Sequence, residues 1–151
     1  MEQMSVQLDF TELPDVHTCR GRGLSPRIRL GTLDPRVSSL AVIAIDPFEP
    51  GCSFVIWLAA GLAPAREIPP GIPAEPVVDF PVRVIQGTGD GGRIGWQPPC
   101  AAPEGPPHQV TIKVYGLDTV PPLEPGFNRN ELVAAMRGHV VQFGSTIALV
   151  R

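Results

Sequence analysis

The distribution of proline constrains this chain more than any other feature of its sequence. Nineteen prolines and sixteen glycines occur in 151 residues, and they interrupt almost every segment. Proline lacks a backbone N–H donor and has a fixed φ, so it is tolerated in loops and at sheet edges but not inside helices. Long helices are therefore excluded over most of the chain, and we expect short elements joined by Pro/Gly-rich loops.

Between the proline clusters lie short runs with the character of β-strands. Residues 39–45 (SLAVIAI) and 53–60 (SFVIWLAA) are almost continuously apolar, as expected for strands that are covered on both faces. Residues 109–117 (QVTIKVYGL) alternate between apolar and polar, as expected for a strand with one buried face. Further strands are expected at residues 6–10, 27–30, 82–85 and 147–150. This pattern predicts an all-β sandwich or barrel, formed by one domain over residues 1–151.

One helix and one long loop complete the predicted organisation. Asn128 and Glu131 have the spacing of a capping box, an apolar stripe follows them, and Gly138 is a natural helix stop. We therefore expect a short helix near the C-terminus. Residues 63–81 have little helix or strand potential and are expected to form a long ordered loop. A loop of this length within a domain is often functional.

Composition narrows the class of protein. Hydrophobic residues make up 43% of the chain and charged residues 18%, which favours a folded globule. The net charge is −3 and the arginines are scattered, so nucleic acid is not an expected partner. Residues 1–10 lack the apolar run of a signal peptide, and the apolar stretch 54–62 is too short to be a transmembrane segment. These features predict a cytoplasmic protein.

The three cysteines are widely separated along the chain. Cys19, Cys52 and Cys100 are an odd number, and no CxxC pair occurs. This pattern favours reduced thiols over a disulfide framework or a zinc site. We therefore expect all three thiols to be reduced and no metal to be bound.

Two segments contain candidate functional side chains. Residues 46–50 (DPFEP) directly follow an apolar strand, so Asp46 either lines a pocket or belongs to an acidic turn. Residues 87–108 are rich in glycine and proline but lack the GxxxxGK[ST] pattern of a phosphate-binding loop. Within them Trp96 and the adjacent prolines would form an apolar wall close to Cys100 and His108. His108 is interpreted either as the partner of a Cys100 nucleophile or as a hydrogen-bonded residue at the start of a strand. His139, after the predicted helix, is expected to be structural.

Six motifs occur in a fixed order along the chain. They cover residues 17–26, 46–50, 54–57, 95–102, 108–118 and 131–140. In this order they resemble motifs of the phosphatidylethanolamine-binding (Raf kinase inhibitor-like) family, in particular of its bacterial and archaeal branch. The resemblance extends over nearly the whole chain with little insertion.

The resemblance implies a two-sheet antiparallel Greek-key sandwich with one or two short helices near the C-terminus. It also implies a small pocket at one end that binds an anion such as a phosphate or a phospholipid headgroup. The positions that correspond to this pocket are Asp46, Pro50, Ile56, Trp57, Trp96, Pro99 and His108. No catalytic residue, cofactor or metal ligand is implied.

Several positions depart from the family pattern. Ile56 stands where the family has a pocket histidine, Phe48 replaces an aspartate, and residues 109–110 replace an Arg-Tyr pair. Each charge-assisted donor that is lost weakens the binding free energy of an anion by about 1.5–3 kcal/mol, which lowers the affinity about ten- to a hundredfold. Either anion binding is weakened, or Arg20 or Arg22 supplies a substitute charge.

Three functions follow from these residues, in decreasing order of preference. The first is a non-enzymatic module that binds a small anionic ligand. The second is a protein-interaction module that regulates a kinase or a protease and uses residues 63–81 as its contact surface. The third is an enzyme that uses Asp46, His108 or Cys100. Bacterial relatives are often dimeric, so a homodimer is a further candidate assembly.

Overall fold

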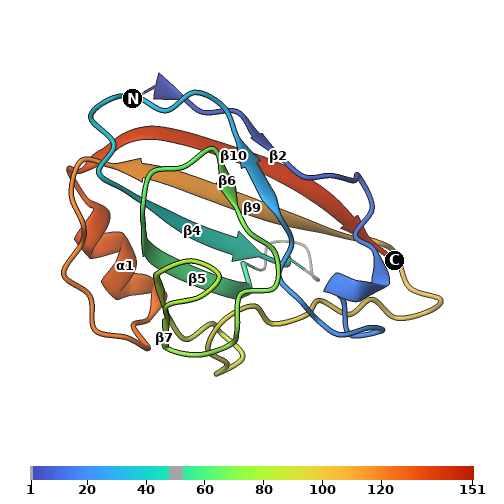
Figure 1. Cartoon of the computed structure of the whole chain (residues 1–151). Coiled ribbons are helices and arrows are strands. Elements are labelled where there is room, and N and C mark those ends of the chain that lie inside the picture. Colours follow the sequence, from blue (N-terminus) through green and yellow to red (C-terminus); the bar gives the residue numbers. More distant parts are fainter. Residues whose placement is uncertain (1, 48–52) are drawn as a thin grey trace.

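The computed structural model of the chain, which describes residues 2–47 and 53–151, contains two β-sheets (Figure 1). The larger sheet has seven strands in the order β1-β10-β9-β4-β5-β8-β7, and the smaller has three in the order β2-β3-β6. The bounds are β1 Glu2–Gln3, β2 Val6–Gln7, β3 Ile28–Leu30, β4 Ser39–Ile45, β5 Val55–Leu62, β6 Glu67–Ile68, β7 Val77–Val78, β8 Val84–Gln86, β9 His108–Leu117 and β10 Val140–Val150. A 3-10 helix, η1 (Asp15–His17), and an α-helix, α1 (Arg129–Met136), complete the fold.

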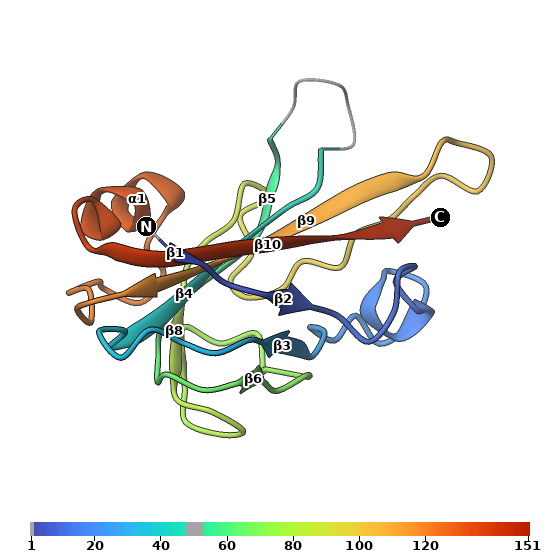
Figure 2. The same ribbon diagram turned by 90° about the horizontal axis from the view of Figure 1, so that it is seen from above.

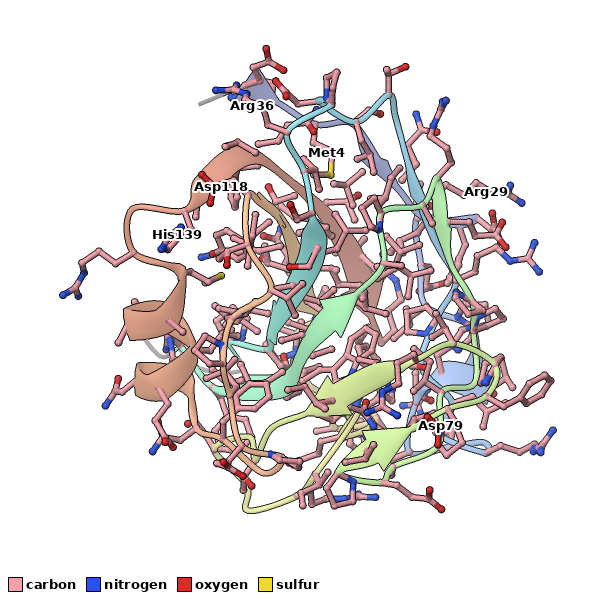
Figure 3. All side chains as sticks on the ribbon, turned by 60° about the vertical axis from the view of Figure 1, so that its left-hand side comes forward. Met4, Arg29, Arg36, Asp79, Asp118 and His139 are labelled. Carbon is pink, nitrogen blue, oxygen red and sulfur yellow. A yellow bond between two sulfur atoms is a disulfide. The ribbon has the colours of Figure 1, made fainter. Side chains whose placement is uncertain are left out.

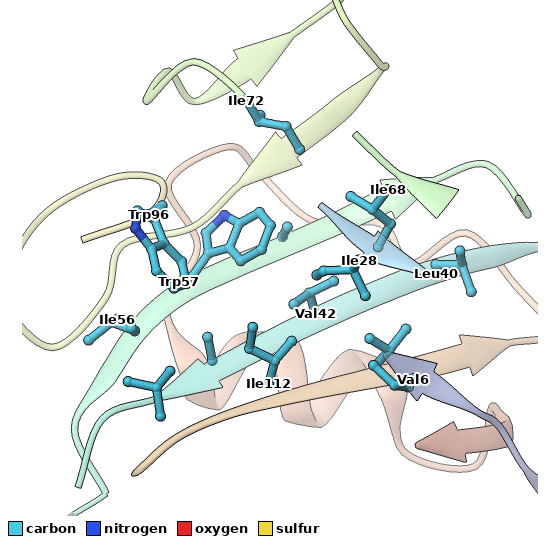
Figure 4. Close-up of a cluster of buried hydrophobic side chains, with 14 of the residues drawn as sticks. Val6, Ile28, Leu40, Val42, Ile56, Trp57, Ile68, Ile72, Trp96 and Ile112 are labelled. Atoms are coloured by element: carbon cyan, nitrogen blue, oxygen red, sulfur yellow. The ribbon is translucent and has the colours of Figure 1, made fainter. Parts of the chain in front are cut away.

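The position of β4 in the fold explains why every residue after its first, Ser39, is apolar. Alternate residues of a strand point to opposite faces. Leu40 and Val42 pack in the core between the two sheets, whereas Ala41 and Ile43 pack in a second core on the other face. Figure 4 shows Leu40 and Val42 in the first of these cores, and Figure 2 shows the strands β2, β3 and β6 on one side of the large sheet. The expected two-faced burial of this strand is confirmed.

Helix α1 covers the second face of the large sheet through Leu132 and Met136, which are buried. The capping box is confirmed: the Asn128 side chain accepts a hydrogen bond from the Glu131 N–H (2.8 Å), and the Glu131 carboxylate accepts one from the Asn128 N–H (3.1 Å). This arrangement satisfies two donors that the first helical turn would otherwise leave unpaired. Within the described residues, none of the helices is long and apolar enough to cross a membrane.

Three details of the fold differ from the sequence-based expectation. Residues 63–81 are not a loop throughout, because they contain the strands β6 and β7. The strand β1 pairs in parallel with β10, so the large sheet is not wholly antiparallel. The strand β10 begins at Val140, seven residues before the predicted start. Strands of two residues, such as β1, β6 and β7, are too short to show a periodic pattern, and only their tertiary pairing defines them.

Candidate functional site

A cavity of about 280 Å³ lies where β4 ends and β5 begins. Asp46 directly follows β4, and its N–H donates to the carbonyl of Phe54, just before β5 (2.8 Å). Ile56 belongs to β5 and accepts a hydrogen bond at its carbonyl from the Gln97 N–H (2.8 Å). The lining residues are Asp46, Phe54, Ile56, Gln97, Pro98, Pro99 and Cys100. The antiparallel pairing of β4 with β5 therefore positions one wall, and residues 97–100 form another.

Asp46 and His108 are in direct contact at this site. The Nδ1 of His108 lies 3.1 Å from Oδ1 of Asp46, and it lies 3.3 Å from Oδ2, with which it forms a hydrogen bond. The exposed fractions of the two side chains are only 14% for His108 and 6% for Asp46. His108 begins β9, and Asp46 extends the neighbouring strand β4, so the sheet itself brings the two groups together.

Burial shifts the pKa of Asp46. It raises the pKa of this carboxyl above its ordinary value of 3.8, and the neighbouring His108 opposes the shift without cancelling it. The Oε1 of Gln97 is buried and accepts no hydrogen bond from the described residues, and the Oδ1 of Asp46 has the ion-pair contact with His108 but no hydrogen bond of its own. A buried oxygen without a hydrogen bond is costly, and both side chains line the cavity. The cavity therefore offers acceptors to a ligand, and a protonated Asp46 would offer a donor as well.

The two tryptophans lie in the core behind the cavity rather than among its lining residues. Trp57 is fully buried, and its Nε1–H donates to Oε1 of Gln86 (2.8 Å). Trp96 is 3% exposed and donates to the carbonyl of His17 (3.0 Å). The rings pack edge to face with their centroids 5.7 Å apart (Figure 4). Both indoles therefore belong to the core, and in sequence they adjoin the lining residues Ile56 and Gln97.

The other predicted positions are placed as follows. Ile56 and Pro99 line the cavity beside Asp46. Pro50 and Phe48 lie outside the described residues. Arg20 and Arg22 are exposed and are not among the lining residues. The Arg20 guanidinium donates to the carbonyl of Ala101 (3.5 Å), next to the lining residue Cys100.

The expectation of three reduced thiols is wrong. Cys19 and Cys100 form a disulfide with a Cα–Cα distance of 5.3 Å, although they are 81 residues apart in sequence. The Cys19 N–H also donates to the Pro99 carbonyl (3.1 Å). A separation of this length gives no local signal, and only the fold brings the two residues together. In this oxidised state Cys100 has no thiol and cannot act as a nucleophile; Cys52 lies outside the described residues.

His139 pairs with Asp118 through its Nδ1 (2.8 Å), and both side chains are about half exposed beyond the end of α1 (Figure 3). Over residues 2–47 and 53–151, no group of three or more His, Cys, Asp or Glu residues is arranged to hold a metal ion.

The fold and the site together define a β-sandwich protein with a small cavity, and a buried carboxylate–imidazole pair, at one end of its large sheet. The model of the phosphatidylethanolamine-binding protein family matches residues 4–151, and the chain belongs to this family.

Individual relatives agree with this assignment. A UPF0098 protein of Pyrococcus horikoshii is 42% identical over 137 residues, which are 91% of this chain and 69% of that protein. A solved phosphatidylethanolamine-binding protein homolog of Chlamydia trachomatis has a TM-score of 0.85 at 23% identity and covers 100% of this chain and 99% of its own. E. coli YbcL, described as a member of the mammalian PEBP family, has a TM-score of 0.84 at 19% identity over 98% of both chains. At these identities the two structures establish the fold.

The raised pKa of Asp46 predicts how a substitution changes stability with pH. A carboxyl whose pKa is higher in the folded than in the unfolded state stabilises the fold when it is protonated. This stabilisation is complete at pH values below the unfolded-state pKa, near 3.8, and is lost as the pH rises through the folded-state pKa. Asp46→Asn cannot ionise, so the variant is expected to be more stable than the wild type at pH 7. Urea unfolding at pH 7 and below pH ~4 should show this advantage shrinking at the lower pH. A variant less stable at pH 7 would show that the contact with His108 outweighs the cost of burial.

Proposed function

We propose that the cavity beside Asp46 and His108 binds a small ligand with an anionic acid group, such as a phosphate or a phospholipid headgroup, without catalysing a reaction. The observation that carries this proposal is the buried Asp46–His108 pair at a cavity of about 280 Å³. Membership of the phosphatidylethanolamine-binding protein family also supports it. A buried carboxyl whose pKa is raised can share a proton with a bound acid, and a protonated His108 adds a cation.

The lining predicts weak binding. Lys and Arg are absent from the described lining, and Ile56, which is 2% exposed, adds an aliphatic wall beside Asp46. A single imidazole supplies at most one cation and two N–H donors. We therefore expect phosphate to bind with a dissociation constant no tighter than about 1 mM, about 4 kcal/mol. Binding should strengthen as the pH falls, because protonation turns Asp46 from a repulsive acceptor into a donor.

The substitution Ile56→His tests the proposal by supplying the missing donor. It is expected to tighten phosphate binding by about tenfold or more, most clearly below pH ~6.5, where an ordinary imidazole is cationic. Calorimetric titration of both proteins with phosphate at two pH values measures the effect. Ile56→Leu is the matched control, because it keeps the volume and apolar character of the side chain and should leave the affinity unchanged.

Two results would contradict this proposal. Tight binding by the wild type that Ile56→His leaves unchanged would mean that another group supplies the donor. Absence of phosphate binding by every variant would favour the second candidate function, a protein-interaction module.

One exposed aromatic residue favours that second function. Phe80 is 85% exposed, and Val77 of the edge strand β7 is 38% exposed; both belong to residues 63–81. Aromatic residues are enriched at the centres of protein interfaces. We propose these residues as the contact surface for a kinase, a protease or a second copy of the chain, in which case Phe80→Ala should abolish the interaction and leave phosphate titration unchanged.

The compartment stays a prediction. The cytoplasmic location was predicted together with reduced cysteines, whereas Cys19 and Cys100 are joined. Disulfides persist in oxidising compartments, and also in intracellular proteins of hyperthermophilic archaea and bacteria. The Cys19–Cys100 bond therefore agrees both with a cytoplasmic location and with an oxidising compartment.

A further inference from the structure

We propose that the redox state of the Cys19–Cys100 disulfide controls the cavity: oxidation fixes the wall formed by residues 97–100, and reduction releases it. This inference rests on the proposed function for the affinity of the site, but not for the behaviour of the wall. Cys100 itself lines the cavity, next to Pro98 and Pro99. Residues 97–100 belong to neither a helix nor a strand, so no sheet hydrogen-bonding ladder holds them. A covalent bond at Cys100 therefore acts directly on the shape of the site.

The contacts of the wall are unevenly distributed. Its first residue, Gln97, is anchored to β5 through the Ile56 carbonyl (2.8 Å). The residues that follow are tied to one segment, residues 17–23, by the disulfide and by the bond from the Cys19 N–H to the Pro99 carbonyl (3.1 Å). Gly23 is part of the same contact, because a Cβ there would lie 2.5 Å from Cγ of Pro98. Loss of the covalent bond would leave residues 98–101 attached to residues 17–23 by this main-chain hydrogen bond, by a long hydrogen bond from the Arg20 guanidinium to the Ala101 carbonyl (3.5 Å), and by packing.

The disulfide is also accessible to a reductant. Cys19 and Cys100 are both exposed, in contrast to the buried residues around them. A thiolate can attack one sulfur to form a mixed disulfide while the other cysteine leaves as a thiolate, and a second thiol then resolves the mixed disulfide. Overall, two external thiols are oxidised to one disulfide while the Cys19–Cys100 disulfide is reduced to two cysteine thiols. A small thiol or a dithiol protein supplies the two electrons and two protons.

Release of the wall would change the environment of Asp46. In the oxidised protein the wall helps to keep this side chain 94% buried, since only 6% of it is exposed. A ligand in the cavity contacts Asp46 on one side and residues 97–100 on the other. Reduction should therefore remove contacts to the ligand and admit water to the carboxyl.

Hydrogen exchange measured by mass spectrometry tests the behaviour of the wall. The protein is compared oxidised and after reduction, both carrying Cys52→Ser so that one pair alone responds to the reductant. At labelling times too short for the amides of β4 and β9 to exchange in either state, we expect the amides of residues 17–23, 100 and 101 to exchange at least about tenfold faster after reduction. The Cys19 amide, which donates to Pro99, reports on the wall directly. Reoxidation should restore the slow exchange, and Cys19→Ser/Cys100→Ser should reproduce the reduced state.

Phosphate titration of the same samples at pH ~5 tests the consequence for binding, with an expected loss of about tenfold in affinity on reduction. Unchanged exchange in the wall would overturn the inference. Acceleration of the wall only at the long labelling times at which β4 and β9 also exchange would overturn it too, because the disulfide would then act on global stability alone. If oxidised protein does not bind phosphate, the proposed function fails, and the exchange measurement still decides whether the wall responds.

Discussion

Replacing Cys19 and Cys100 with serine is expected to lower the free energy of unfolding by about 4 kcal/mol. The disulfide closes a loop defined by a sequence separation of 81 residues. A bond across a loop of this length removes much of the conformational entropy of the unfolded chain, which the chain-entropy model values at about 4 kcal/mol. The two segments that it joins contain little regular structure, so few other contacts replace the bond. Urea unfolding of the variant and the oxidised wild type measures the difference.

The single variants provide an internal control. Cys19→Ser and Cys100→Ser each break the same bond, so each should lose nearly as much stability as the double variant, and the losses should not add. Reductant should destabilise the wild type to the same extent and leave the double variant unchanged. A loss below about 1 kcal/mol would show that the unfolded chain is already constrained without the bond.

The sequence predicted best those strands in which the order of apolar and polar residues matches the burial of the two faces. β4 is apolar at every position after Ser39 because both of its faces are covered, and β9 alternates because one face is less buried. The capping box at Asn128 is local too, since both of its hydrogen bonds join residues three apart. In each case the predictive signal lies within the element itself, either in the pattern of its residues or in contacts between residues close in sequence.

Long-range pairing explains what the sequence did not reveal. The strands β6 and β7 have two residues each and exist because β3 and β8 pair with them. The strand β10 contains Gly144, and glycine is depleted in strands, yet Gly144 pairs with Val114 of β9. The disulfide belongs to the same category, because residues 81 apart in sequence are joined by topology alone.

The candidate site was predictable in part. Family motifs pointed to Asp46, Ile56 and Pro99, which line the cavity, and to His108, which contacts Asp46. The motifs could not distinguish lining residues from supporting ones. Their neighbours at 54, 97, 98 and 100 also line the cavity. Trp57 lies in a strand adjacent to the site, but its ring is held in the core by a hydrogen bond to Gln86, which is 29 residues away in sequence.

That glutamine, Gln86, is the second position at which a substitution should have a large effect, with an expected loss of about 3 kcal/mol or more for Gln86→Ala. Gln86 is fully buried in β8. Its Oε1 accepts the Trp57 N–H (2.8 Å), and its Nε2 donates to the carbonyls of Pro73 (2.7 Å) and Glu75 (2.9 Å). Removing the amide leaves these groups without their partner and opens a cavity in the core, and each unsatisfied buried group costs about 1–3 kcal/mol.

A double-mutant cycle separates these contributions. Trp57→Phe removes the indole N–H, so Gln86→Ala should cost less in a Trp57→Phe background than in the wild type, by about 1 kcal/mol or more. Gln109→Ala is the matched control: this glutamine is exposed on β9, and its loss should change stability by no more than about 0.5 kcal/mol. Urea unfolding gives all of these values. Equal losses for Gln86→Ala in both backgrounds would show that the hydrogen bond from Trp57 contributes nothing, and that Gln86 stabilises the fold through residues 73–75 alone.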